Sequence, residues 1–337
     1  MLLSALFPPP LTAPFATPRA PAIVASGSVV ALDFDGVLCD SEPELTRSAW
    51  RTAKTLWPEL MASAADLSEE PWRAGARRAW TGGDWQPLQG DGADGLPNWL
   101  AFKMRTLRPS IETGYESMLL IRLCVDEALA ASRATGGERP LTSGEICANW
   151  PDLRDALLAR YALREEEAVE AFGSVRDSWI ADDLEGWLDA NRFYPGAVEA
   201  MRGAINGGVG PSNLYVVTTK QQRFALELLR AAGLELDDDH VFGLGSGPKV
   251  QTLCSLQQKH EGSTLSFVED RVDTLRTVAN DPRLFGCRLF FAGWGYSDSE
   301  QQAAAASMPR VRSLGQPGEL EDICAGVPLE SKDWRDA

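Results

Sequence analysis

The 337-residue sequence is longer than one typical domain, and its 44% hydrophobic and 24% charged residues are typical of a globular protein with two structural units. The net charge of −16 argues against nucleic-acid binding, which needs a basic face, and no apolar run approaches the roughly 20 residues that span a membrane. Six cysteines without a CxxC pair and only two histidines argue against a disulfide framework, a zinc site or a histidine metal cluster.

The first 28 residues differ from the rest of the chain. They contain one basic residue, Arg19, five serines or threonines and many prolines and alanines, and the first acid of the chain is Asp33. An acid-free leader rich in alanine and hydroxyl residues is typical of an organelle transit peptide. The single arginine favours a chloroplast (plastid) over a mitochondrion. The alternative is a disordered leader on a cytoplasmic protein.

The next predicted elements are one strand and a long helical region. Residues 28–32 form a short apolar run, which indicates a buried strand. Residues 43–190 then show helical character with breaks at glycine and proline. The helical periodicity is clearest over 44–57, 115–132 and 152–171.

From residue 191 the pattern changes to alternating strands and helices. The predicted strands are 213–218, 241–243, 264–268 and 288–292, and the predicted helices are 196–204, 223–232, 250–260 and 273–280. Such alternation predicts an α/β fold, a doubly wound parallel sheet with helices on both faces. We expect residues 29–42 and 191–337 to form this domain, and residues 43–190 to interrupt it as an all-α domain.

Two acids follow the first predicted strand. Asp33 and Asp35 stand two residues apart, so they leave the strand on the same side, and Gly36 allows the backbone to turn. Carboxylates this close repel each other unless a cation or a shared proton compensates. With a divalent metal, one can be an ionised nucleophile and the other a general acid and base.

Three further polar clusters fall at strand ends or helix starts, where ligands gather in open α/β sheets. Thr218 and Thr219 follow the second strand and could donate to a phosphoryl oxygen, or form only a turn that caps the next helix. Lys249 precedes a helix and could offset phosphate charge, with a surface lysine as the alternative. Glu269 and Asp270 end a strand, and Asp270 would complete a magnesium shell unless it only caps the next helix.

The four clusters resemble, in this order, the motifs of the haloacid dehalogenase-like superfamily. Two further stretches, Phe193-Tyr194-Pro195-Gly196 and Trp294-Gly295-Tyr296, resemble its phosphoglycolate phosphatase-like branch. The likeness covers residues 29–42 and 191–312. It implies a Rossmann-like core with a helical cap inserted after the first motif, which is where residues 43–190 stand.

The resemblance also implies roles for individual residues. Asp33 would form an aspartyl-phosphate, and Asp35 would protonate the leaving group and then activate water. The residues implied in substrate binding are Thr218, Thr219, Lys249 and Gly36. The residues implied in holding Mg²⁺ are Asp33, Asp35 through its carbonyl, Asp270 and, as the candidate second acid, Glu269.

The acid at position 35 favours phosphoryl transfer, since dehalogenases that resemble this fold lack it. We therefore predict a Mg²⁺-dependent phosphatase that hydrolyses a small phosphorylated metabolite through an aspartyl-phosphate. The alternatives are a sugar-phosphate mutase of the same fold and a non-catalytic binding protein that keeps the fold. The most basic stretch of the predicted cap, Lys103, Arg105 and Arg108, could hold a second anionic group of the substrate, and solvated helix charges are the alternative.

Overall fold

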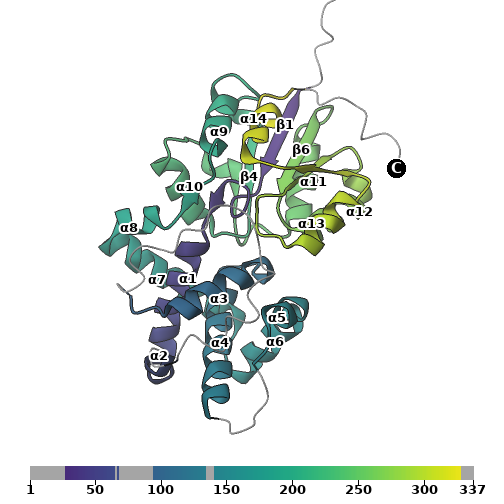
Figure 1. Ribbon diagram of the computed structural model, residues 1–337. Helices are drawn as coiled ribbons and strands as arrows, with labels where there is room; N and C mark the ends of the chain where they lie inside the picture. The colour runs from purple at the N-terminus through teal and green to yellow at the C-terminus, as the bar shows by residue number, and fades with distance from the viewer. Residues whose placement is uncertain (1–26, 65–66, 68–93, 134–139, 328–337) are drawn as a thin grey trace, which may run out of the picture.

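A computed structural model describes residues 27–64, 67, 94–133 and 140–327 (Figure 1). All but the last two residues of the predicted leader lie outside this part of the chain, so the targeting assignment stays a prediction. The described chain has an α/β half, at the top of Figure 1, and a helical half below it. No helix of the described residues is long and apolar enough to cross a membrane.

The α/β half is built on a sheet whose neighbouring strands are all parallel, which confirms the predicted fold class. In chain order its strands are β1 (Ser28–Leu32), β4 (Leu214–Val217), β5 (Val241–Phe242), β6 (Thr264–Glu269), β7 (Arg288–Ala292) and β8 (Val311–Leu314). In space they lie in the order β5-β4-β1-β6-β7-β8. The chain therefore runs outward from β1 in both directions, and the carboxyl end of β1 is the switch point where ligands bind in such sheets.

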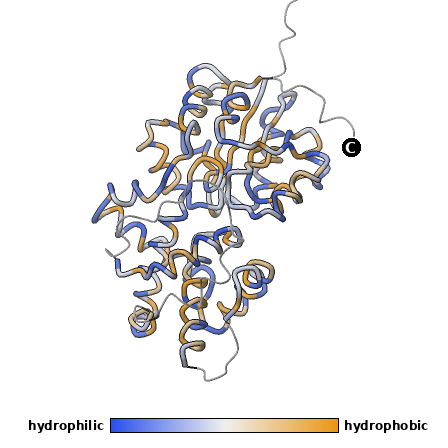
Figure 2. Tube along the Cα trace, viewed as in Figure 1, coloured by the Kyte–Doolittle hydropathy of each residue, from blue (hydrophilic) through white to orange (hydrophobic). Residues whose placement is uncertain are grey.

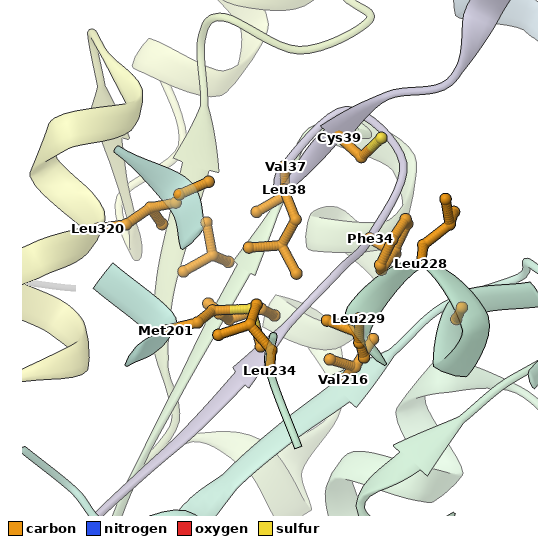
Figure 3. Packing of buried hydrophobic residues seen from close by; sticks show 14 of the residues in the cluster. Phe34, Val37, Leu38, Cys39, Met201, Val216, Leu228, Leu229, Leu234 and Leu320 are labelled. Carbon is orange, nitrogen blue, oxygen red and sulfur yellow. The ribbon is translucent and has the colours of Figure 1, made fainter. Parts of the chain in front are cut away.

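Helices cover both faces of the sheet, because alternate residues of a buried strand point to opposite sides. Val30 and Leu32 belong to one hydrophobic cluster, part of which is shown in Figure 3, and Val29 and Ala31 belong to another. The first cluster contains residues of α9 (Ala197–Asn206), α10 (Gln222–Ala231) and α14 (Leu320–Cys324). The second contains residues of α11 (Lys249–Lys259), α12 (Val272–Asn280) and α13 (Ser299–Ala306).

The helical half leaves and rejoins the α/β half through a two-stranded antiparallel ribbon, β2 (Cys39–Asp40) and β3 (Arg192–Phe193). Its helices, called the cap below, are α1 (Glu42–Leu56), α2 (Pro58–Ala64), α3 (Asn98–Leu107), α4 (Glu116–Arg133), α5 (Ser143–Ala148), α6 (Trp150–Arg160), α7 (Glu165–Asp182) and α8 (Leu184–Asp189). The cap has its own core, in which Trp50, Leu119 and Phe172 are buried. Figure 2 shows hydrophobic positions recurring along the helices of both halves, as expected for helices with one buried face.

Short 3₁₀ turns complete the described chain. They are η2 (Arg108–Ser110), η3 (Pro211–Asn213), η4 (Asp238–His240), η5 (Pro282–Leu284) and η6 (Pro317–Glu319). The turn η2 follows α3 directly and brings the cap to the α/β half.

Two sequence predictions need correction. The helix predicted over 152–171 is two helices, α6 and α7, because Ala162 adopts a left-handed conformation (φ 53°) that ends the first. The sequence predicted no strand after 288–292, but a further strand, β8, pairs with that strand at the edge of the sheet. Only Leu314 of β8 is fully buried, so the strand lacks the apolar run that identified the others.

Candidate active site

Asp33 and Asp270 lie side by side because their strands are neighbours. Strand β1 pairs with β6 along its whole length, and the backbone N–H of Asp33 donates to the carbonyl of Val268 at 2.9 Å. The carboxylates of Asp33, Glu269 and Asp270 are buried, and one oxygen of each lies within 4.8 Å of the others. The structure thus brings together acids that are more than 230 residues apart in the sequence.

Lys249 lies between two of these acids. Its Nζ atom is 2.9 Å from Asp33 Oδ2 and 2.8 Å from Glu269 Oε2. The other oxygen of Glu269 accepts the backbone N–H groups of Asp270 (3.1 Å) and Arg271 (3.0 Å). Both Glu269 oxygens therefore have protein donors, which makes Glu269 a residue that orients Lys249.

Asp270 is held by the loop after β7, and the turn at Gly36 lies against it. Asp270 Oδ2 accepts the backbone N–H of Tyr296 at 2.7 Å. Gly36 has a φ of 87°, which favours glycine, and a Cβ atom at this position would overlap the Asp270 carboxylate. Gly36 therefore acts through backbone shape: it allows the turn after Asp33 to approach Asp270.

The electrostatics of Asp33 and Asp270 suit a divalent cation. Burial raises the pKa of Asp33 above its ordinary value, although the ammonium of Lys249 opposes the shift. Burial and then the charge of Asp33 raise the pKa of Asp270. A cation between two buried carboxylates this close relieves their repulsion, and oxygen ligands of this kind are those that Mg²⁺ prefers. The residues present fit a magnesium ion held by Asp33 and Asp270.

Asp35 is bound to a second lysine. Lys220 Nζ lies 3.0 Å and 3.3 Å from the two Asp35 oxygens, and the Ser41 hydroxyl donates to Oδ1. Burial acts to raise the pKa of Asp35, but the charges of Lys220 and Arg108 outweigh it and lower the pKa below its ordinary value. The sequence analysis assigned no role to Lys220, although it directly follows Thr218-Thr219 at the end of β4.

The two threonines after β4 have different surroundings. Thr218 is buried, and its Oγ1 accepts the backbone N–H of Lys220 at 3.2 Å. The Thr219 hydroxyl donates to the backbone carbonyl of Glu112, in the cap, at 2.6 Å. Thr219 therefore links the end of β4 to the cap, and its predicted contact with a phosphoryl oxygen stays a prediction.

The three basic residues of the cap have separate environments. Lys103 donates to the carbonyl of Leu141 inside the cap, and Arg105 forms ion pairs with Asp40 and Glu42, each 3.0 Å long. Arg108 lines a space between cap and sheet that also contains Asp35. Because Lys103 is 8% exposed and Arg108 7% exposed, the interpretation of this stretch as solvated helix charges is wrong.

Comparison with known proteins gives a likeness in solved structures. No protein-family model matches the chain, and no curated protein sequence matches it. A predicted phosphoglycolate phosphatase from Haemophilus somnus is 14% identical over 89% of this chain and 99% of its own, with a TM-score of 0.45. A predicted phosphatase from Clostridium acetobutylicum is 13% identical over 88% and 97%, with a TM-score of 0.44. Since identities and TM-scores are this low, the site's own geometry has to support a function.

That geometry defines a class of site. The ends of β1, β4 and β6 and the start of α11 bring two lysines, three buried carboxylates and a fourth carboxylate at position 35 together at the carboxyl end of the sheet, under a helical cap. The two lysines, with a metal ion held by the acids, could neutralise the charge of a phosphoryl group beside an ionised carboxylate.

Proposed function

We propose that the protein is a Mg²⁺-dependent phosphatase of the haloacid dehalogenase-like class, which hydrolyses a small phosphomonoester through an aspartyl-phosphate on Asp33. The observation that supports this most directly is the buried contact of Asp33 with Lys249, beside Asp270, at the carboxyl ends of β1 and β6. An aspartate nucleophile must stay ionised, and the negative charge of the phosphoryl group that it attacks must be neutralised. The ammonium group of Lys249 favours the ionised form of Asp33 and would also neutralise charge on the phosphoryl group.

The proposed first step breaks the phosphate ester. A carboxylate oxygen of Asp33 attacks phosphorus, the bond to the leaving oxygen breaks, and that oxygen takes a proton from Asp35. In the second step Asp35 removes a proton from water, whose oxygen attacks phosphorus and releases Asp33 and inorganic phosphate. Mg²⁺, held by Asp33, Asp270 and the carbonyl of Asp35, would neutralise charge on the phosphoryl oxygens.

Asp35 needs a proton before it can serve as the acid. Without substrate, Lys220 keeps it ionised. A phosphate dianion bound beside it acts in the opposite direction, because a like charge raises the pKa of a carboxyl group and also attracts Lys220 away from it. We propose that Lys220 releases Asp35 and binds the phosphoryl group when the substrate arrives, so that Asp35 can take up a proton.

The remaining residues hold the reactive groups in place. Glu269 orients Lys249, and Gly36 lets the first turn approach Asp270. Thr218 is the candidate hydroxyl donor to a phosphoryl oxygen.

Hydrolysis of an aryl phosphate with and without Mg²⁺ tests the proposal. We expect turnover that a chelator abolishes and that Asp33→Asn reduces to background, whereas Asp182→Asn, at an exposed site on α7, retains it. Inorganic phosphate should appear in the same amount as the alcohol. Unchanged turnover in Asp33→Asn would refute the nucleophile, and phosphate moving between sugar positions without release would indicate a mutase.

A further inference from the structure

Arg108 reaches the site from the cap. It is the first residue of η2, and it lines an open space of about 420 Å³, solvent at its mouth included, together with Asp35, Lys220 and Thr219 of the α/β half. The side chain is 7% exposed although it carries a full positive charge. Arg108 therefore presents its charge to this space from a largely buried position.

The guanidinium of Arg108 is held without the help of an acid. It stacks on the ring of Tyr296, 3.8 Å from its centroid, and its Nη1 donates to the carbonyl of Ile111 at 3.0 Å. Tyr296 is itself fixed at both ends: its N–H donates to Asp270, and its hydroxyl donates to Asp40 and accepts the N–H of Ser41. The cation is therefore oriented before any ligand arrives.

In the described part of the chain Arg108 forms no direct ion pair, although the carboxylates of Asp35, Asp270 and Glu42 lie near enough to act on its charge. No carboxylate there lies within 4.0 Å of its nitrogens, and Nε is buried without a hydrogen-bond partner. Two other arginines near the same interface differ, since Arg105 pairs with Asp40 and Glu42, and Arg176 pairs with Glu44. A buried charge is costly unless it is paired.

The charge of Arg108 acts on the reactive groups. It contributes to lowering the pKa of Asp35 after Lys220 does, and it opposes the rise in the pKa of Asp270. Arg108, Asp35 and Lys220 also line the same space, so an anion bound in that space would lie beside both cations.

We propose that Arg108 binds an anionic oxygen of the substrate, and that this is how the cap recognises it. The inference rests on the proposed function, because it assigns a residue to the same site. The oxygen belongs either to the phosphoryl group or to a carboxylate on the leaving group. Both are planar or trigonal arrays of acceptors that a guanidinium binds with two hydrogen bonds.

The position of η2 links this contact to the cap. Thr219 donates to the carbonyl of Glu112, and Arg271 Nη1 donates to the carbonyls of Pro109 (3.2 Å) and Ile111 (3.0 Å). Thr219 and Arg271, which are neighbours of Lys220 and Asp270 in the sequence, thus hold the segment that carries Arg108. These contacts hold the charge of Arg108 at the site.

Binding measurements that need no turnover test the inference. The probes are methylphosphonate and a phosphonate that also carries a carboxylate, since neither can be hydrolysed, and calorimetry with Mg²⁺ gives their Kd. We expect Arg108→Met to weaken binding about tenfold to a hundredfold, the effect of losing a charge-assisted hydrogen bond, and Arg108→Lys to restore part of it. Arg122→Met is the matched control: Arg122 also stacks on aromatic rings in the cap but does not line the space.

The two probes identify the oxygen. Weaker binding of both assigns Arg108 to the phosphoryl group, and weaker binding of the carboxylated probe alone assigns it to the leaving group. Unchanged Kd values for both probes in folded Arg108→Met and Arg108→Lys would overturn the inference while leaving the phosphatase proposal intact. Arg108-dependent binding without any hydrolysis by the wild type would support the inference and refute the phosphatase.

Discussion

Removal of Arg176 should destabilise the cap, because it would leave a buried acid without its partner. Arg176 of α7 and Glu44 of α1 have side-chain exposures of 3% and 0%. Arg176 donates from Nε to Oε1 at 2.6 Å and from Nη2 to Oε2 at 2.5 Å, and the Ser48 hydroxyl is the remaining side-chain donor at 2.7 Å. Breaking such a buried pair from one side costs about 3–5 kcal/mol.

Urea denaturation of Arg176→Met, followed by tryptophan fluorescence, measures this loss in the free energy of unfolding. A second substitution, Glu44→Leu, removes the stranded carboxylate and should recover most of it, since apolar replacements of buried pairs are often neutral. Arg164→Met is the control, because Arg164 pairs with Glu167 in an exposed position and should contribute little. A loss below about 1 kcal/mol in Arg176→Met would refute the reasoning.

The pH dependence of the same variant has a definite sign. Burial raises the pKa of Glu44, but Arg176, together with the charge of Lys220 and the Ser48 hydrogen bond, outweighs burial and holds the pKa below its ordinary value of 4.5. In the wild type this stabilisation is present above pH 4.5 and is lost as the pH falls through the lowered pKa. In Arg176→Met the largest charge that opposes burial is gone, while Lys220 and Ser48 remain, so the pKa of Glu44 rises. The stability difference between the two proteins should therefore shrink as the pH falls from 7.5 to about 5.5. A difference that grows over this range would contradict the assignment.

Three other substitutions should separate the parts of the site. Gly36→Ala forces a methyl group toward the Asp270 carboxylate, so we expect a higher Mg²⁺ concentration for half-maximal activity, and an unchanged Mg²⁺ dependence would contradict the close approach. Glu269→Gln removes the negative charge that orients Lys249, so we expect kcat to fall by about 10–100-fold with little change in Mg²⁺ affinity. A selective loss of Mg²⁺ affinity would instead make Glu269 a metal ligand. Arg271→Ala frees the turn η2 and should raise KM more than it lowers kcat; an unaltered KM would show that the turn needs no such contact.

The strands of the sheet could be predicted where burial is complete. The runs at β1 and β7 are apolar throughout their buried residues, and both strands have the predicted bounds. Strand β8 lies at an edge with only Leu314 fully buried, so it carries no such signal. The break between α6 and α7 depends on one residue, Ala162, whose left-handed conformation is not encoded by a glycine.

The site could be predicted in part for a related reason. Asp33, Lys249 and Asp270 were candidates by position, because each stands at the end of a strand or the start of a helix, and the family resemblance then gave them roles. The roles of Lys220 and Arg108 depend on contacts across the fold: Lys220 meets an acid 185 positions away, and Arg108 meets Tyr296 only where the cap lies against the sheet. Contacts between residues so far apart in the chain cannot be predicted from the spacing of residues in the sequence.

A crystal structure with Mg²⁺ and beryllofluoride would test most directly whether Asp33 and Asp270 share one cation. We expect beryllofluoride on a carboxylate oxygen of Asp33, and an ion at roughly 2.0–2.1 Å from an oxygen of each aspartate, the distance typical of Mg²⁺. An ion bound elsewhere, or Asp270 turned away from Asp33 with both carboxylates free of metal, would contradict the proposed enzyme.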